Sequence, residues 1–295
     1  MQHVRDLIRL MRPYQWVKNG FVLVGLLFGH GWSDSAQVAV VMQMFMAFCL
    51  ASSGVYVMND IHDREADRAH PRKQHRPVAS GAVGVREAAI WVVVLCASAL
   101  LLAASVSVAA VAIVAAYIVL NVAYSNGLKH VAVLDVFLIA AGFMLRILAG
   151  TTGVDIDPSP WLLGCGMMLT LFLGFAKRRA EFATLESDPG GENGAMQRPS
   201  LDGYSAALLD RLIGISAAGA VIGYAFYSLD ARTVALHGTS NLILTLPFVI
   251  YGLFRYLFAL YRNGAGADPA RDLLHDPHLI GALVGWLLVT WWLIA

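Results

Sequence analysis

The sequence predicts an all-α, polytopic membrane protein with nine transmembrane helices. Of its 295 residues, 58% are hydrophobic and 14% are charged, a composition too apolar for an ordinary soluble domain. The apolar residues form nine runs, most of them near the ~20 residues that an α-helix needs to cross a bilayer. Because no repeat or low-complexity tail interrupts the pattern, we expect a single domain over residues 1–295. A formal net charge of +1 gives no reason to expect a nucleic-acid partner.

In chain order, the nine predicted spans cover residues 15–31, 37–58, 86–106, 108–125, 132–150, 160–177, 209–228, 241–260 and 277–294. The first span is irregular because Lys18 and Asn19 lie near its beginning. The third and fourth spans form one apolar tract, which we divide near residues 104–107. Arg146 and Arg255 lie within the fifth and eighth spans. Intramembrane charges of this kind usually face the bundle interior or a water-filled cavity.

The distribution of lysine and arginine predicts the orientation of the chain. Most of the 21 basic residues lie in the N-terminal arm and in the junctions that follow the even-numbered spans, and such segments stay in the cytoplasm. We therefore expect a multi-pass protein of the inner (plasma) membrane, with a cytoplasmic N-terminus and its C-terminus on the opposite side. The arm itself is short, basic and amphipathic, and we do not interpret it as a cleaved signal peptide.

Two long cytoplasmic loops, near 59–84 and 181–206, are expected to cap a central cavity that opens to the cytoplasm. In the first loop, Pro71 and Pro77 end any helix that continues from the membrane. The second loop contains D-P-G-G-E-N-G, which is typical of a flexible and poorly ordered linker.

An acidic stretch, N-D-I-H-D-R-E-A-D, directly follows the second span. If the helix continues, an arc of about 100° on one face carries four side chains that can bind a metal, those of Asn59, Asp60, Asp63 and Asp67. Carboxylates at this spacing repel each other, and hard oxygen ligands suit Mg²⁺, which takes one or two carboxylates and completes its shell with water and substrate phosphates. The stretch therefore predicts a magnesium diphosphate site at a membrane surface, with Asn59, Asp63 and Asp67 as metal ligands. The alternative is a solvated charged face at the end of a span.

Basic residues follow the acids within a few positions. Binding a polyphosphate between a metal on one side and guanidinium or ammonium groups on the other is chemically favourable. We therefore interpret the basic cluster that follows the acids as part of a polyphosphate site; its members are Arg72, Lys73, His75 and Arg76. The alternative is that the basic residues only set the topology of the protein.

Two further constellations lie at the cytoplasmic ends of later spans. In Y-S-N-G-L-K, either Tyr124 and Lys129 contact phosphate oxygens, or the stretch is an ordinary Asn-Gly turn with one anchoring lysine. In K-R-R-A-E, either Lys177 and Arg178 form a second anion site, or Lys177 and Glu181 form an intrahelical ion pair. In the first of these interpretations, Glu181 orients the lysine or binds a sugar hydroxyl.

Together these motifs resemble the UbiA superfamily of intramembrane prenyltransferases. The resemblance rests on nine spans, on N-D-x-x-D-x-x-x-D from Asn59, on R-P-x-x-S-G from Arg76 and on Y-S-x-x-L-K from Tyr124, and it covers nearly the whole chain. Ordinary members carry a second aspartate motif, D-x-x-x-D, after the sixth span, whereas the equivalent stretch here is K-R-R-A-E. One full acidic motif is left instead of two, which argues against an isoprenyl diphosphate donor.

With K-R-R-A-E in place of the second aspartate motif, the chain resembles one branch of the superfamily, the decaprenyl-phosphate phosphoribosyltransferases. The chain resembles that branch in R-P-x-Q-W-x-K-N from Arg12, N-D-x-x-D-x-E-A-D-R-x-H-P from Asn59, Y-S-x-G-L-K-H from Tyr124 and K-R-x-A-E from Lys177. The resemblance implies transfer of 5-phosphoribose from 5-phosphoribosyl-1-diphosphate to a polyprenyl phosphate, with Mg²⁺ as cofactor and diphosphate as leaving group. The product would be a precursor of an arabinofuranosyl donor for cell-envelope polysaccharides.

The resemblance also implies a role for each candidate residue. The catalytic residues would be Asp60, Asp63, Asp67, Tyr124 and Lys129. The substrate-binding residues would be Lys18, Asn19, Arg68, Lys73, Arg76, Tyr124, Lys129, Arg146, Lys177, Arg178 and Glu181. The lipid phosphate is already anionic at neutral pH and can attack the anomeric carbon itself, so positioning and charge stabilisation would supply the catalysis.

Other functions stay open at this point. A true UbiA prenyltransferase would move an isoprenyl chain from its diphosphate to an aromatic or other acceptor. A transporter or channel would be expected to carry acidic residues in the middle of its spans, whereas most of the acids here gather at one cytoplasmic edge. An oligomer is possible, because the small-residue runs at 97–110 and 217–220 could pack helices within one chain or between chains.

Overall fold

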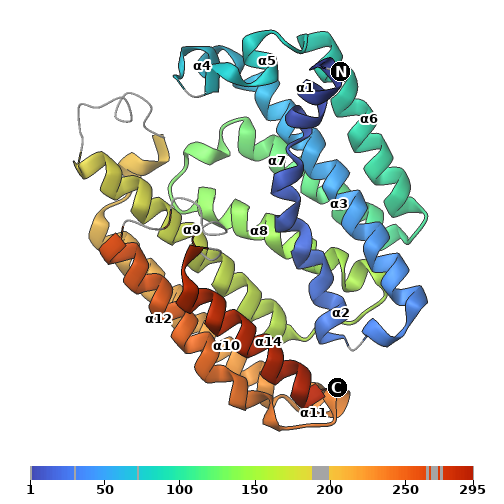
Figure 1. Cartoon of the computed structure of the whole chain (residues 1–295), viewed down its shortest axis with the longest axis vertical. Helices are drawn as coiled ribbons and strands as arrows, with labels where there is room; N and C mark the ends of the chain where they lie inside the picture. Colours follow the sequence, from blue (N-terminus) through green and yellow to red (C-terminus); the bar gives the residue numbers. More distant parts are fainter. Residues whose placement is uncertain are drawn as a thin grey trace. The chain divides into compact units, whose positions relative to one another are not determined.

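The computed structural model describes residues 2–294, except His30, Arg72 and the ranges 188–198, 264–265, 267–271 and 273–274 (Figure 1). Over these residues the chain is helical and contains no strand. It divides into two compact units, one formed by Met1–Leu128 and Gly142–Pro158 and the other by Lys129–Ala141 and Ser159–Ala295. Helix α8 runs through both units, so the expected single domain stays a prediction.

The first unit is built around α3. Its elements are α1 (Gln2–Met11), η1 (Pro13–Leu23), α2 (Val24–Phe28), η2 (Gly31–Ser33), α3 (Ser35–His62), α4 (Arg64–Ala69), η3 (Lys73–His75), α5 (Pro77–Ser80), α6 (Val85–Ala104), α7 (Val108–Ser125), the second half of α8 (Leu134–Ala149) and η5 (Thr152–Val154). The α3 helix packs against η1, α6 and α7. Buried residues on these helices form the core of the unit, with Phe48 and Met44 among the largest.

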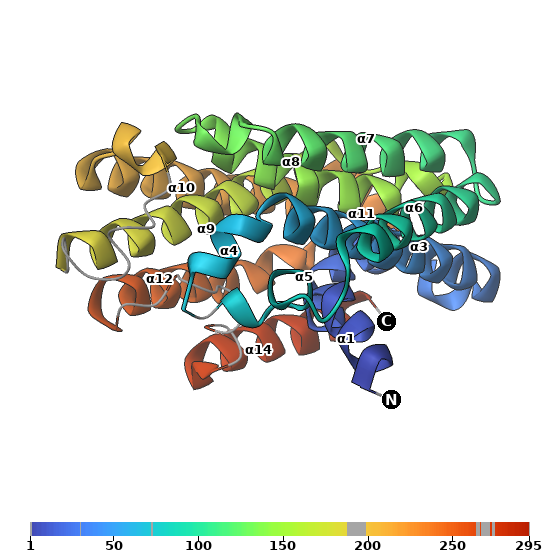
Figure 2. The ribbon, with the colours of Figure 1, turned by 90° about the horizontal axis from the view of Figure 1, so that it is seen from above.

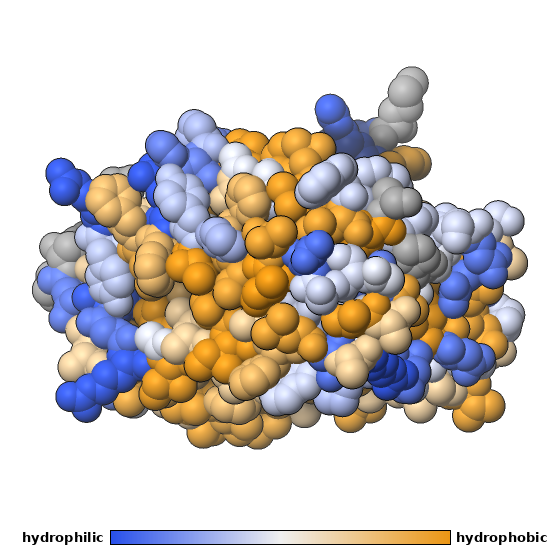
Figure 3. Space-filling view, turned by 90° about the horizontal axis from the view of Figure 1, so that it is seen from below, coloured by the Kyte–Doolittle hydropathy of each residue, from blue (hydrophilic) through white to orange (hydrophobic). Residues whose placement is uncertain are grey.

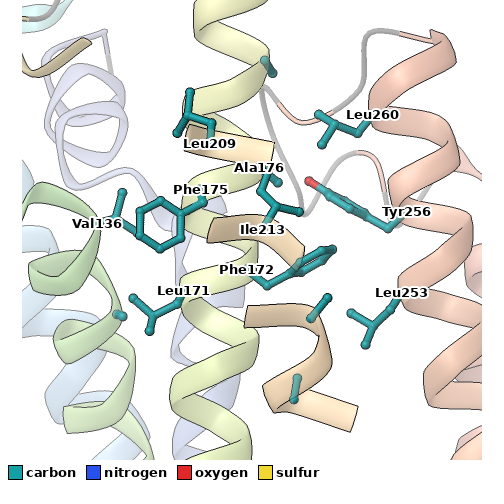
Figure 4. Packing of buried hydrophobic residues seen from close by; sticks show 14 of the residues in the cluster. Val136, Leu171, Phe172, Phe175, Ala176, Leu209, Ile213, Leu253, Tyr256 and Leu260 are labelled. Atoms are coloured by element: carbon teal, nitrogen blue, oxygen red, sulfur yellow. The ribbon is translucent and has the colours of Figure 1, made fainter. Parts of the chain in front are cut away.

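The second unit is built around α9 and α10. Its elements are most of η4 (Leu128–His130), the first half of α8, α9 (Pro160–Ser187), η7 (Pro199–Gly203), α10 (Ala206–Leu229), α11 (Ala231–His237), η8 (Asn241–Thr245), α12 (Leu246–Asn263) and α14 (Pro277–Ile294). Figure 4 shows the core around α9, where Phe172 points toward Tyr256 of α12 and Phe175 points toward Val136 of α8. The rings of Phe172 and Tyr256 pack edge to face in this core.

Eight of the nine predicted spans are helices that are long and apolar enough to cross a membrane. The division near residues 104–107 is confirmed, because α6 ends at Ala104 and Ser107 caps α7 by accepting a hydrogen bond from the backbone N–H of Ala110 at 2.9 Å. Large apolar side chains such as Leu101, Val119 and Trp292 are exposed, and apolar atoms cover a broad part of the face in Figure 3. The protein is a multi-pass integral membrane protein.

The first predicted span, 15–31, is not one long α-helix. It consists of η1 and α2, which run alongside α3 in the opposite direction (Figure 1). The backbone of this segment packs so closely against the end of α8 that a Cβ on Gly25 would lie 1.7 Å from the carbonyl oxygen of Gly150. A 3₁₀ helix rises about 2.0 Å per residue, so η1 and α2 together extend over about 30 Å. The segment is therefore still long enough to span the hydrocarbon core.

The two expected cap loops differ from each other. The first, 59–84, contains α4, η3 and α5, and α5 begins at Pro77 as the fixed φ of proline favours. In the second, 181–206, the prediction of a linker is wrong for residues 181–187, which continue α9 as helix. The D-P-G-G-E-N-G stretch lies outside the described residues. The chain is described again from η7, which leads into α10.

Candidate active site

The acidic stretch lies at the junction of α3 and α4 in the first unit. Asp63 is the single residue between the two helices, yet its backbone N–H donates to the carbonyl of Asn59, and the N–H of Asp67 donates to the carbonyl of Asp63, both at 2.8 Å. The i to i−4 pattern therefore continues across the junction. Of the four side chains, those of Asp60 and Asp67 are buried, whereas those of Asn59 and Asp63 are partly exposed.

Two arginines neutralise the buried acids. Arg76 bridges them, with its Nη1 at 3.2 Å from Asp60 Oδ1 and 2.6 Å from Asp67 Oδ2. Arg12 forms a second ion pair with Asp60. Each carboxylate is 2% exposed, and burying an unpaired charge to this extent would be costly. The predicted repulsion among the acids is therefore offset by guanidinium groups of this chain.

Arg12 was not among the residues that we expected at this site. It stands between α1 and η1 with φ 53° and ψ 57°, a left-handed conformation that is rare for a residue with a side chain. The following Pro13 disfavours the right-handed helical region for this residue. Its guanidinium also lies over the ring of Tyr56, 5.2 Å from the ring centre. The ion pair with Asp60 and the contact with the Tyr56 ring stabilise this left-handed conformation of Arg12. No local sequence rule predicts the conformation.

Asn59 connects the acidic stretch to α7. The hydroxyl of Ser125 donates to Asn59 Oδ1 at 2.6 Å and also to the carbonyl of Asn121 at 2.9 Å. Tyr124, which precedes Ser125 on α7, is partly buried, as is Lys129 in η4. The structure thus joins the end of α3 to the Y-S-N-G-L-K stretch through Ser125, a contact that the sequence did not predict, and the roles of Tyr124 and Lys129 stay predictions.

The donor atoms of the acidic stretch fit Mg²⁺. Carboxylate and amide oxygens are hard ligands. Within the described part of the chain, no group of three or more His, Cys, Asp or Glu side chains is arranged to hold a metal ion, so the metal ligands stay a prediction. Because Asp60 already forms ion pairs with two guanidinium groups, we infer that it orients Arg12 and Arg76 and does not bind the metal. The candidate ligands remain Asn59, Asp63 and Asp67.

Asn19 and Arg146 form a buried polar pair inside the first unit. Arg146 Nε donates to Asn19 Oδ1 at 2.8 Å, and its Nη2 donates to the hydroxyl of Tyr117 at 3.0 Å. Asn19 in turn donates to Ser52 Oγ at 3.2 Å. The Arg146 guanidinium also lies over the rings of Phe48, Phe143 and Tyr117. These contacts tie η1 to α3, α7 and α8 and thereby place η1 and its Lys18, and the expected contact of Asn19 and Arg146 with substrate stays a prediction.

The remaining basic candidates of the first unit differ in exposure. Lys18 is partly buried in η1, whereas Arg68 and Lys73 are exposed. Arg68 Nε donates to the carbonyl of Ala79 at 3.0 Å and thereby connects α4 to α5. Arg68 also lies 3.4 Å from Glu65, and a surface pair of this kind contributes little to stability.

In the second unit, Arg178 is fully buried. Its Nε lies 2.7 Å from Asp135 Oδ2, and its Nη1 lies 2.6 Å from Glu181 Oε2. Asp135 also accepts hydrogen bonds from the hydroxyls of Tyr204, at 2.9 Å, and Ser200, at 3.3 Å. The network joins α8, α9 and the η7 segment. Arg178 is 1% exposed and pairs with Glu181, and the expected second anion site at Lys177 and Arg178 stays a prediction.

Asp135, Ser200 and Tyr204 complete this network and were not among the predicted site residues. Tyr204 also accepts a hydrogen bond at 2.6 Å from the backbone N–H of Val133, whose φ of 68° is left-handed. Burial raises the pKa of Tyr204, the N–H of Val133 lowers it and the bond to Asp135 raises it further. The phenol thus stays protonated and donates to Asp135. Lys177, next to Arg178 on α9, is partly buried.

We expect Arg178→Met to destabilise the protein by about 3–5 kcal/mol, because it leaves the buried carboxylate of Asp135 without its cation. The thermal midpoint in detergent would fall clearly below that of the wild type. Arg211→Gln is the control, because Arg211 is an exposed arginine on α10 and should leave the midpoint unchanged. An equal midpoint for Arg178→Met and wild type would contradict the structural role of the network.

Comparison with known proteins places the fold and the motifs in one family. The model of the UbiA prenyltransferase family matches residues 20–275. The decaprenyl-phosphate phosphoribosyltransferase of Mycolicibacterium smegmatis is 34% identical, over 96% of this chain and 91% of the relative. That of Corynebacterium glutamicum is also 34% identical, over 95% of this chain and 84% of the relative.

A solved structure shows the same fold. It is a UbiA homolog from Archaeoglobus fulgidus bound to DMAPP and Mg²⁺, which is 20% identical, covers 98% of this chain and 96% of its own, and has a TM-score of 0.70. The family model extends over most of the chain, and two relatives exceed 30% identity over nearly its full length. The chain therefore belongs to the UbiA prenyltransferase family.

Proposed function

We propose that this protein transfers 5-phosphoribose from 5-phosphoribosyl-1-diphosphate to a polyprenyl phosphate in the membrane and releases diphosphate. The proposal rests mainly on which residues form the acidic stretch and the K-R-R-A-E stretch. The first unit has a complete acidic stretch with Arg76 bridging Asp60 and Asp67. The stretch K-R-R-A-E, in contrast, uses its glutamate to neutralise Arg178. The similarity to two decaprenyl-phosphate phosphoribosyltransferases supports the same assignment.

The chemistry assigned to the chain is binding and charge stabilisation. Bound Mg²⁺ would neutralise the diphosphate and make it a better leaving group. Asn59, Asp63 and Asp67 would hold the metal, and Arg76 is positioned by Asp60 to bind phosphate oxygens. Tyr124 and Lys129 are assigned to further phosphate oxygens. The lipid phosphate attacks the anomeric carbon as the C–O bond to diphosphate breaks, so no protein nucleophile is required.

The proposal includes the membrane topology. We infer that the protein lies in the inner membrane with the acidic stretch at the cytoplasmic surface, because the phosphosugar is water-soluble and basic residues surround that stretch. The polyprenyl tail would enter from the bilayer. The product would supply an arabinofuranosyl donor for cell-envelope polysaccharides.

A donor assay on purified protein in detergent tests the proposal. Radiolabelled phosphoribosyl diphosphate with polyprenyl phosphate is compared with radiolabelled isoprenyl diphosphate and an aromatic acid, each with Mg²⁺. We expect label in the lipid phase only from the phosphosugar, and its loss when EDTA removes the metal. Transfer from the isoprenyl diphosphate alone would instead identify a prenyltransferase that works with a single acidic stretch.

Lys177 is our candidate for the 5-phosphate of the donor. Lys177→Asp restores the acid that ordinary family members carry at this position, so it replaces an attraction for phosphate by a repulsion. We expect the Michaelis constant for the phosphosugar to rise about tenfold to a hundredfold, as the loss of a charged hydrogen bond of about 1.5–3 kcal/mol implies. Initial rates over a range of donor concentrations measure this. An unchanged Michaelis constant would show that Lys177 has only a structural role.

A further inference from the structure

The N-terminal helix α1 is fixed to the first unit by one face only. Leu10 is 1% exposed and packs in a cluster with residues of α3, α5 and α6. His3 Nε2 lies 2.7 Å from Glu87 Oε1 at the start of α6. Val4 and Ile8, one turn apart on another face, are 58% and 53% exposed. Figure 2 shows α1 extending outward to the N-terminus. The helix therefore offers an apolar edge to its surroundings.

Two arginines accompany this apolar edge. Arg5 and Arg9 each follow one of the exposed apolar residues, so they lie about 100° further around the helix. Both are exposed, and within the described residues no carboxylate forms an ion pair with either of them. Apolar side chains flanked by unpaired arginines are typical of helices that lie in the interface of a bilayer and contact anionic head groups.

The end of α1 leads directly to the acidic stretch. The carbonyl of Met11 accepts a hydrogen bond from Ser53 Oγ at 2.9 Å, and Trp16 Nε1 donates to the same hydroxyl at 3.0 Å. The next residue, Arg12, has the left-handed conformation and forms the ion pair with Asp60. Anything that fixes α1 on the membrane surface therefore also restrains the residue that holds Asp60.

We propose that α1 is an interfacial helix that binds anionic phospholipid head groups through Arg5 and Arg9, and that this binding supports the pair of Arg12 with Asp60. The apolar edge of α1 inserts at the boundary of head groups and acyl chains, and the two guanidiniums bind lipid phosphates. The effect on turnover rests on the proposed function, whereas the binding of α1 to lipid does not.

Hydrogen exchange in nanodiscs that hold one chain each tests the binding. The full-length protein is placed in phosphatidylcholine alone and in a mixture with phosphatidylglycerol. We expect the backbone amides of 2–11 to exchange at least tenfold more slowly in the anionic discs, since each arginine near a charged surface adds roughly fivefold in binding. Arg5→Gln combined with Arg9→Gln should lose this protection, and Arg211→Gln on α10 should keep it.

Equal exchange of α1 in the two kinds of disc would overturn the proposal. Protection in phosphatidylcholine discs that appears only with polyprenyl phosphate would also overturn it and would assign the arginines to the lipid substrate. Protection that is absent from these discs and appears only in discs prepared with two chains each would overturn it as well. The apolar edge of α1 would then be assigned to contact with a second copy of the protein.

Turnover measured in the same discs separates the two proposals. If phosphoribosyl diphosphate is the donor, anionic lipid should raise its turnover several-fold in wild type but not in the double variant. If no donor activity is found, the proposed function fails while the exchange result still decides the role of α1.

Discussion

Asp63→Asn is expected to lower kcat/KM for the phosphosugar about 10³-fold, which corresponds to ~4 kcal/mol of transition-state stabilisation. The substitution keeps the size of the side chain but removes the negative charge that would hold Mg²⁺ near the diphosphate. Asp63 is partly exposed at the junction of α3 and α4, so the thermal midpoint should stay at its wild-type value. Steady-state rates at saturating lipid and a melting curve in detergent measure both quantities.

The matched control for this variant is Glu65→Gln. Glu65 lies on α4 two residues away and pairs only at the surface, with Arg64 and Arg68. Because such pairs contribute little, the control should retain nearly full activity. If Asp63→Asn were as active as Glu65→Gln, the assignment of Asp63 to the metal would have to be abandoned.

Asp60→Leu is expected to have the largest effect on stability, about 3–5 kcal/mol. The carboxylate is 2% exposed and pairs with both Arg12 and Arg76, so the apolar replacement leaves the partly buried guanidinium of Arg12 without its counter-charge. Arg12 would also lose the contact that holds its left-handed turn. Chemical or thermal unfolding in detergent measures the loss.

A second substitution distinguishes a lost ion pair from a packing defect. In the double variant Arg12→Met with Asp60→Leu, the unpaired charge is gone and two apolar side chains face each other. We expect this variant to recover much of the stability, since replacing a buried pair by apolar residues is often close to neutral. A double variant as unstable as Asp60→Leu alone would show that the shape of Asp60, and not its charge, is what the site requires.

The sequence predicts most of the membrane-spanning framework because long apolar runs determine it. Eight spans correspond to helices, and Ser107 divides α6 from α7 where a polar residue interrupts the tract. The first span departs from an α-helix for reasons that are tertiary: a close backbone approach of Gly25 to Gly150 and the burial of Asn19 against Arg146. Hydropathy measures transfer into lipid and carries no information on such contacts.

The candidate site is predictable where its residues are adjacent in sequence and not where they are distant. Helical periodicity predicts a shared face for Asn59, Asp60, Asp63 and Asp67, and the helical hydrogen-bond pattern does continue through Asp63 to Asp67. The pairing of Asp60 with Arg12 joins residues 48 positions apart, and the network around Asp135 joins residues 43 to 69 positions apart. No periodic pattern relates such residues, so their partners become visible only in the folded chain.

The most direct measurement of the central claim is the intact mass of the lipid product formed when both donors compete in one reaction. Purified protein in Mg²⁺ receives phosphoribosyl diphosphate, an isoprenyl diphosphate, polyprenyl phosphate and an aromatic acid together. We predict a polyprenyl phosphate whose mass has increased by one phosphoribosyl group, and no prenylated aromatic acid. A prenylated aromatic acid with unmodified polyprenyl phosphate would contradict the proposed function.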